Sequence, residues 1–292
     1  MTDVVLAIDF GGTKTAVGCV SASGELLVSR RLPTAPTADV VHRAVKEATQ
    51  LRQQTPPGWQ LIGAGVVSPG VVLEDRILLA PNMPGWESLS LSGELHAGFA
   101  GLPVTTGNDV QAAALAEARW GNLAGRDGLY VNLGTGLGSA IVLDGRVIRG
   151  HHGAAGEIGY ARGKDGRTLE EVIGGGGLGA RASQIAGRAM SAAEAFASAD
   201  PRVRRGVDEA IAEFARELAN LATLLDPERV VIGGGLANDG DRLLGPLRET
   251  FEKIVPFPAE IVASAFARDA SLFGAAALAI TQALEVSECL EL

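Results

Sequence analysis

Residues 4–20 of the chain read VVLAIDFGGTKTAVGCV. The apolar runs from Val4 to Ile8 and from Ala16 to Val20 have the length and composition of buried strands. The glycines between them permit a tight turn, so we interpret the stretch as strand, glycine turn and strand. Backbone N–H groups in such a turn can bind a phosphate, because no Cβ keeps the anion at a distance.

A second copy of this pattern lies near the middle of the chain. Leu129 to Leu133 is an apolar run, Gly134 to Gly138 is a glycine turn, and Ser139 to Leu143 is a returning strand. Neither turn has the Walker A spacing, and the second leads into a strand, unlike a dinucleotide-binding glycine run. A lone glycine hairpin is more often structural, but two hairpins in equivalent places predict a pair of loops that could enclose a triphosphate.

The other segments alternate between strands and helices. Strands are predicted around residues 62–67, 104–106 and 229–232, and helices around residues 39–54, 112–119, 211–225 and 272–284. This alternation in both halves predicts an α/β fold. A length of 292 residues favours two domains, with a single domain as the alternative.

Composition excludes several classes of function. The formal net charge of −9 argues against a general nucleic-acid or anionic-membrane binder, which needs a positive surface. Cys19 and Cys289 form no CxxC pair, so neither a disulfide framework nor a cysteine-rich zinc site is expected. The sequence contains no export signal or membrane-spanning apolar run, so we expect a cytoplasmic protein with no membrane or nucleic-acid partner.

Two aspartates stand at the ends of predicted strands. Asp9 precedes the first glycine turn, where a carboxylate can orient water on a phosphate-bound Mg²⁺; the alternative is a turn-capping role. Asp109 follows the strand at residues 104–106, where a carboxylate could act as the general base that a kinase needs for an alcohol acceptor. The spacing alone fits a helix N-cap at Asp109 equally well, and Asn108 beside it could anchor a neighbouring hydroxyl.

Five motifs together resemble the ROK family of sugar kinases. They are Asp9 to Thr15, Ala80 to Trp86, Asn108 to Glu117, Gly134 to Gly138 and Gly156 to Gly159, in an order and spacing that cover nearly the whole chain. The resemblance implies two actin-like (ribonuclease H-like) ATPase domains, with the sugar and ATP in an interdomain cleft. The expected domains are residues 1–107, completed by a C-terminal helix at 277–292, and residues 108–276.

The resemblance also implies a role for each matching residue. Asp109 would be the general base for a sugar 6-hydroxyl, and the ring hydroxyls would be held by Asn82, Asn108, Glu157 and Glu170 as well as by Asp109 itself. The cofactors would be ATP and Mg²⁺, with Asp9 contacting Mg²⁺ through water. The phosphates would lie against Gly11, Gly12, Thr13, Lys14, Gly134, Thr135 and Gly136, and the adenosine would lie against Gly233, Gly234 and Gly235. A homodimer is expected by resemblance only.

The sequence departs from the family at its zinc site. Most members carry a His after Glu-x-Gly and three cysteines downstream, but this chain has Tyr160 at the His position and no cysteine between residues 161 and 169. We therefore expect no structural zinc. Tyr160 could contact the sugar or fill the space of the missing loop, while His151 and His152 are interpreted as loop residues rather than ligands.

Several functions fit these features. The first is an ATP:sugar 6-phosphotransferase acting on a hexose or aminohexose, as a glucokinase does. The altered zinc loop makes a kanosamine (3-amino-3-deoxyglucose) 6-kinase of an antibiotic pathway an alternative, because a cationic amino group could pair with Glu157 or Glu170. A sugar-responsive regulator has little support, since the chain starts directly with the first strand and is acidic. An ATPase that needs no sugar is the remaining alternative, and the sugar, the oligomeric state and the phosphate donor stay open.

Overall fold

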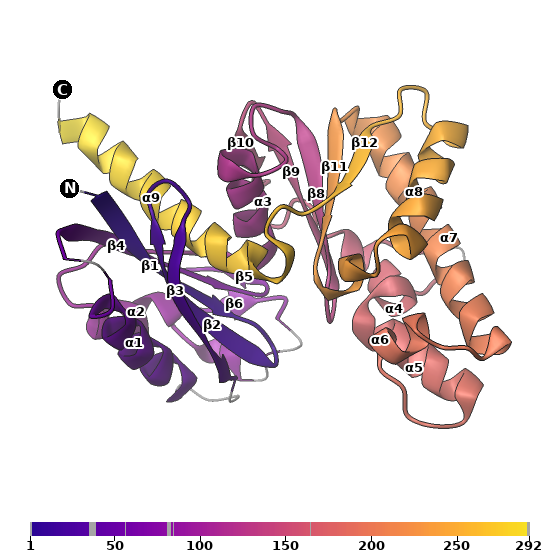
Figure 1. Cartoon of the computed structure of the whole chain (residues 1–292), viewed down its shortest axis with the longest axis horizontal. Coiled ribbons are helices and arrows are strands. Elements are labelled where there is room, and N and C mark those ends of the chain that lie inside the picture. The colour runs from indigo at the N-terminus through magenta and orange to yellow at the C-terminus, as the bar shows by residue number, and fades with distance from the viewer. Residues whose placement is uncertain are drawn as a thin grey trace. The chain divides into compact units, whose positions relative to one another are not determined.

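A computed structural model of the chain describes residues 2–34, 39–55, 57–80, 83, 85–163 and 165–290. The chain folds into two compact units, Met1–Trp120 with Asp269–Leu292, and Gly121–Arg268 (Figure 1). Each unit is built around a five-stranded mixed sheet.

The first sheet has the strand order β3-β2-β1-β4-β7. Its strands are β1 (Thr2–Phe10), β2 (Lys14–Ser21), β3 (Leu26–Pro33), β4 (Trp59–Ser68) and β7 (Val104–Asn108). The first three form an antiparallel meander, whereas β1, β4 and β7 run parallel. The register pairs Asp9 with Val67 and Ser68 with Asn108, so the carboxyl ends of the three parallel strands share one edge.

Both faces of this sheet are covered, as the alternation of side chains along β1 requires. Val4, Leu6, Ile8 and Phe10 pack toward α1 (Asp39–Arg52), the 3₁₀ turn at Trp86–Ser88 and α2 (Leu91–Gly98). Val5 and Ala7 pack toward α9 (Ala270–Leu290) on the opposite face. In the same unit, β5 (Val71–Val72) and β6 (Ile77–Leu78) pair with each other as a separate two-stranded antiparallel sheet.

Helix α3 (Asp109–Trp120) belongs to the first unit, because it packs against α9 at very short range. A Cβ on Gly274 of α9 would lie 2.3 Å from the carbonyl carbon of Ala112, so only glycine allows this approach. The chain therefore changes units after Trp120 and again at Asp269, whereas the sequence placed the changes after residues 107 and 276.

The second unit repeats the first sheet with the order β10-β9-β8-β11-β12. Its strands are β8 (Gly128–Leu133), β9 (Leu137–Leu143), β10 (Arg146–Ile148), β11 (Arg229–Gly233) and β12 (Glu260–Ala263). Again an antiparallel meander precedes two parallel neighbours. The repeat that the two glycine hairpins predicted is confirmed at the level of topology.

Helices cover one face of this second sheet and bury its largest apolar cluster. They are α4 (Leu169–Ile173), α5 (Gly175–Ala186), α6 (Ala192–Phe196), α7 (Pro201–Leu225) and α8 (Asp241–Ile254). The longest, α7, presents Phe214 and Leu218 to the strands and ends at Asp226, whose φ of 48° is left-handed just before Pro227. Short 3₁₀ turns lie at Ile158–Tyr160 (η2), Gly235–Asp239 (η3) and Ala267–Asp269 (η4).

Candidate active site

The first glycine turn joins β1 to β2, and its carbonyl groups accept hydrogen bonds from within the protein. The amide of Gly11 donates to the carbonyl of Lys14 at 3.1 Å, which closes the turn. Thr34 then donates its amide to the carbonyl of Thr13 at 3.1 Å and its hydroxyl to the carbonyl of Gly11 at 2.7 Å. Sequence reasoning did not single out Thr34, because nothing local to the turn indicates a residue some twenty positions downstream.

The second glycine turn, between β8 and β9, is held in the same way. The amide of Gly134 donates to the carbonyl of Gly136 at 3.0 Å. The first amides of α5 replace Thr34 here, because Gly175 donates to the carbonyl of Gly134 at 3.0 Å and Gly176 to that of Thr135 at 2.9 Å. The start of α5, a run of glycines, was another feature that the sequence analysis missed.

These bonds leave amides at the tips of both turns for a ligand. Within the described residues, the amides of Gly12, Thr13, Thr135 and Gly136 have no acceptor in the protein. Gly12, Thr13 and Thr135 are exposed, and so is Lys14 beside the first turn. Successive amides with their carbonyls turned away form a concave anion-binding surface, so each turn fits a phosphate.

Asp9 and Asp109 lie at the carboxyl ends of β1 and β7 in the first unit, and both are partly buried. Burial raises the pKa of Asp109 to about 6, against the hydrogen bond from the Val110 amide, which lowers it. Burial, with the negative charges of Asp109 and Asp269 nearby, raises the pKa of Asp9 to about 8. A carboxyl group whose pKa lies near neutrality is suited to taking up a proton during catalysis.

One cation, Arg31, acts on the carboxylates of both Asp9 and Asp269. Arg31 of β3 forms an ion pair with Asp269 and lowers the pKa of Asp9. Within the described residues, no three His, Cys, Asp or Glu side chains converge closely enough to hold a metal ion. The excess of negative charge around Asp9 is nevertheless of the kind that a divalent cation could offset.

Asn108 caps helix α3. Its Oδ1 accepts from the amides of Val110 and Gln111, each at 2.9 Å, and its Nδ2 donates to the carbonyl of Gly70 at 2.9 Å. The capping role that the sequence allowed for Asp109 is therefore filled by Asn108, one residue earlier. One amide hydrogen of Asn108 and one carboxylate oxygen of Asp109 take no part in these bonds.

The third glycine turn follows β11 and lies against the base of the second hairpin. Gly234 has a φ of 87°, and a Cβ there would lie 2.3 Å from the carbonyl oxygen of Leu133. A Cβ on Gly233 would lie 2.2 Å from the hydroxyl of Tyr130, so this glycine is needed for packing. Gly235 is exposed and opens η3, which leaves a bare backbone surface beside the hairpin.

Glu157 and Glu170 approach the second hairpin from two further elements. Gly156, with a φ of 91°, accepts from the amide and the hydroxyl of Ser139 at 2.9 and 2.8 Å, which places Glu157 beside β9. Glu170 of α4 accepts from the amide of Leu137 at 2.9 Å through Oε2. Both glutamates are partly buried, and both belong to the second unit.

Tyr160 is 51% exposed, so its ring does not fill an internal space. Partial burial, together with the charges of Glu157 and Glu170, raises the pKa of its phenol, so the hydroxyl lies within their electrostatic reach. His151 and His152 are exposed and touch each other edge to face, with ring centroids 4.6 Å apart. Asn82, expected to hold the sugar, lies outside the described residues.

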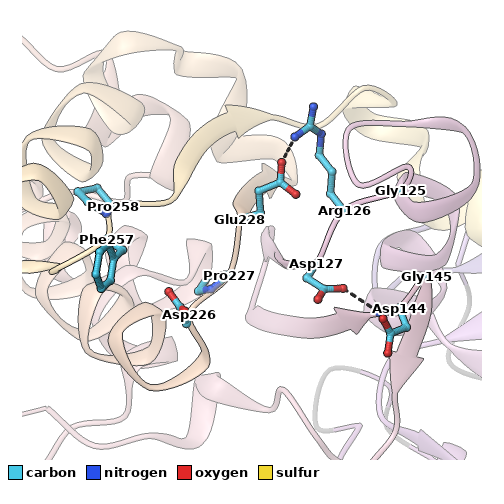
Figure 2. Close-up of a pocket in the computed structure, with 10 residues that line it drawn as sticks. All are labelled: Gly125, Arg126, Asp127, Asp144, Gly145, Asp226, Pro227, Glu228, Phe257 and Pro258. Atoms are coloured by element: carbon cyan, nitrogen blue, oxygen red, sulfur yellow. Dashed lines mark hydrogen bonds and ion pairs between the residues drawn. The ribbon is translucent and has the colours of Figure 1, made fainter.

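A hollow of about 910 Å³ in the second unit lies away from the glycine turns. Figure 2 shows Asp127 and Asp144 facing Asp226 and Phe257 across it. The hollow is at the amino ends of β8 and β11, and a strand of five or six residues separates those ends from the turns by roughly 16–20 Å. Ligands of α/β sheets bind at the carboxyl ends of strands, so we place the candidate site at the turns instead.

None of the helices in the described ranges combines the length and hydrophobicity needed to cross a bilayer.

Known proteins match the chain over nearly its whole length. The sequence profile of the ROK family matches residues 5–282 of the chain.

Relatives of known name and structure extend over the same region. The glucokinase of Streptomyces coelicolor is 30% identical over 94% of this chain and 97% of its own length. The N-acetylmannosamine kinase of Salmonella heidelberg is 30% identical over 94% of this chain and 97% of its own length. A ROK family glucokinase from Streptomyces griseus, crystallised with glucose and AMPPNP, superposes with a TM-score of 0.80 at 28% identity, over 94% of this chain and 98% of that one.

These similarities confirm the actin-like ATPase fold that the sequence predicted. They also account for the duplicated sheet with a glycine turn in each half. The profile match covers far more than half of the residues, and the named relatives cover nearly all of them. The chain therefore belongs to the ROK family.

Proposed function

We propose that this chain transfers the γ-phosphoryl group of ATP to the 6-hydroxyl of a hexose or aminohexose, with Asp109 as the general base. The observation that carries the proposal is the carboxyl group of Asp109, at the carboxyl end of β7, with a pKa raised to about 6. The kinase relatives and the AMPPNP-bound glucokinase support ATP as donor and a sugar as acceptor.

In this reaction the 6-oxygen forms a bond to the γ-phosphorus while the bond from that phosphorus to the β,γ-bridging oxygen breaks. Asp109 takes the hydroxyl proton, and ADP leaves with the electron pair of the broken bond. The free amides at the tip of each hairpin would bind phosphate oxygens. Mg²⁺, oriented through water by Asp9, would supply charge neutralisation on the triphosphate.

We assign the remaining sugar contacts to Asn82, Asn108, Glu157 and Glu170. Amide and carboxylate groups pair well with the donors and acceptors of a polyol, and leaving one of them buried without a partner is costly. Gly233 to Gly235 would lie against the adenosine, because they present backbone without side chains.

The test is a panel of hexoses, aminohexoses and N-acetylhexosamines assayed for ADP release, with wild type and Asp109→Asn side by side. We expect sugar-dependent ADP release from wild type, and a loss of at least 100-fold in kcat with sugar KM within a few fold in the variant, in line with the usual contribution of a general base. Asp75→Asn makes the same change on a side chain that is 73% exposed and should behave as wild type.

Two outcomes would overturn the proposal. Release of ADP at the same rate with and without every sugar would indicate an ATPase that needs no acceptor. Preserved turnover in Asp109→Asn would place the base elsewhere.

An aminosugar acceptor has an observation of its own. The negative charges of Glu157 and Glu170 raise the pKa of the Tyr160 phenol, so the three groups lie in one electronegative neighbourhood, which favours a cationic amino group on the sugar. A kanosamine kinase is the specific form of this alternative. Comparison of kcat/KM for 3-amino-3-deoxyglucose and glucose decides it, and equal or better use of glucose would rule the aminosugar out as the preferred substrate.

A further inference from the structure

The side chain of Glu170 is part of the second phosphate hairpin as well as of the proposed sugar site. Its Oε2 accepts the hydrogen bond of the Leu137 amide at 2.9 Å, at the point where the hairpin enters β9. A Cβ on Gly136 would lie 2.3 Å from the same oxygen, so the carboxylate lies directly against the turn. Oε1 is 3.7 Å from that position and remains available to another donor.

The backbone around Glu170 is fixed on both sides. Thr168, two residues before Glu170, is the N-cap of α4 and forms a capping box with Glu171, which fixes the start of the helix. The carbonyl of Glu170 accepts from the Gly174 amide at 2.9 Å, and the chain then runs directly into Gly175 and Gly176, which bind the hairpin carbonyls. The side chain therefore reaches the hairpin from a rigid support, at little cost in conformational entropy.

Glu170 is the only side chain among these contacts, since α5 reaches the hairpin through backbone amides. The bond to Leu137 is charge-assisted, and such bonds are stronger than those between neutral groups. It determines where the last amide of the hairpin points. The amides of Thr135 and Gly136 precede it in the same turn, so their orientations depend on this bond as well.

We propose that Glu170 is a positioning residue for the triphosphate: through Oε2 it holds the hairpin in the shape that binds phosphate, while Oε1 is left for the sugar. This inference rests on the proposed function, in which the hairpin binds phosphate oxygens. A single carboxylate then serves both substrates. Binding of one substrate is thereby linked to the geometry that the other requires.

Two conservative variants separate the effect of the length of the Glu170 side chain from the effect of its charge. Glu170→Gln keeps the length of the side chain and an oxygen acceptor for the Leu137 amide, but removes the charge. Glu170→Asp keeps the charge but is one methylene shorter, so it cannot reach the amide from the same helix position. Glu249→Gln, on an α8 side chain that is 70% exposed, is the matched control.

The measurement is calorimetric binding of a non-hydrolysable ATP analogue with Mg²⁺, without sugar, together with sugar KM in the coupled assay. We expect Glu170→Asp to weaken analogue binding roughly tenfold, the equivalent of one hydrogen bond, and Glu170→Gln to stay within about threefold of wild type. The control should not differ from wild type. Thermal melting of each variant shows whether the fold is kept.

The outcomes distinguish the inference from the proposed function. Analogue affinity that is unchanged in Glu170→Asp, or lost equally in both variants, overturns the positioning role even if sugars are phosphorylated normally. If no sugar is phosphorylated by wild type, the proposed function fails, but the analogue affinities still test whether Glu170 shapes the hairpin. A variant that unfolds at assay temperature also counts against the inference, because a positioning residue should leave the fold intact.

Discussion

Replacing Asp109 by Asn should stabilise the protein without ligands while it removes catalysis. The raised pKa means that the charged form of Asp109 is disfavoured in the folded state, chiefly by burial. Asn has nearly the same shape, and its Oδ1 can still accept the bond from the Val110 amide, which is 2.9 Å long in the wild type. The substitution therefore removes an unfavourable charge and keeps the local geometry.

The magnitude follows from the pKa. A rise from 3.8 to about 6 corresponds to roughly 3 kcal/mol of unfavourable charging free energy. Between these two values the folded state binds more protons than the unfolded state, so stability falls as pH rises through this window. The cost is present in full above about pH 6 and is largely absent at pH 4, where the folded state is almost fully protonated and the unfolded state has begun to protonate.

The assay is thermal unfolding of wild type and Asp109→Asn at pH 8 and at pH 4, without nucleotide or Mg²⁺. At pH 8 we expect an increase in Tm of roughly 6–12 °C for the transition of the first unit, from the usual relation between free energy and Tm for a domain of this size. Relief of the repulsion with Asp9 adds to the gain. At pH 4 most of the increase should disappear.

Two results would refute this reasoning. An increase in Tm of equal size at both pH values would show that the gain does not come from the charge. A lower Tm for Asp109→Asn at pH 8 would mean that the carboxylate is stabilised in the folded protein. Asp75→Asn, with its side chain 73% exposed, should leave Tm unchanged to within a degree or so and controls for the chemistry of the substitution.

Three further predictions concern pH and packing. Because the base must be deprotonated, kcat/KM for the sugar should rise with pH up to about 6 and then level off, and a profile that is flat from pH 5 to 8 would contradict the role of Asp109. Gly65→Ala should lower the free energy of unfolding in denaturant by more than about 3 kcal/mol, since the new Cβ would lie 1.7 Å from the carbonyl oxygen of Ala275. Gly63→Ala is the control and should cost under about 1 kcal/mol, because the nearest atom to its Cβ would be 3.4 Å away. Equal losses in the two variants would contradict this account of the packing of α9 on β4. Arg31→Leu should lower stability by about 1 kcal/mol at pH 8 and by less at pH 4, because the Asp9 carboxylate, whose charge Arg31 offsets, is protonated at pH 4. A loss independent of pH would argue against this electrostatic role.

The sequence was sufficient to predict the duplicated sheet. Two apolar runs around a glycine turn form the same hairpin wherever they occur, because the pattern is local and the turn needs glycine. The predicted helix at 272–284 also lies within α9, which the structure extends from Ala270 to Leu290. The unit boundaries were harder to predict from the sequence, because they depend on the packing of α3 on α9. Ala112 and Gly274 make that contact, and nothing in the sequence around either residue indicates it.

The parts of the site that sequence reasoning missed are all contacts over long sequence separation. Thr34 binds the first hairpin from the end of β3, and Gly175 binds the second from the start of α5. The sequence indicated both Asn108 and Asp109 as candidates, but only the side-chain geometry shows which of the two caps the helix. An asparagine and an aspartate at a helix start are interchangeable in a motif, and only the bonds of Asn108 to Val110 and Gln111 show which residue is the cap.

The raised pKa values of Asp9 and Asp109 describe a site whose stability is lowered before its ligands bind. Burial and mutual repulsion of these carboxylates cost folding free energy, and a cation near Asp9 would offset part of that cost by favouring both charged forms. Mg²⁺ together with an ATP analogue should therefore raise the Tm of wild type more than that of Asp109→Asn, in which the repulsion is already gone. In the proposed mechanism this destabilising charge has a use, because the proton of the acceptor hydroxyl needs a base and a neutral amide cannot take it.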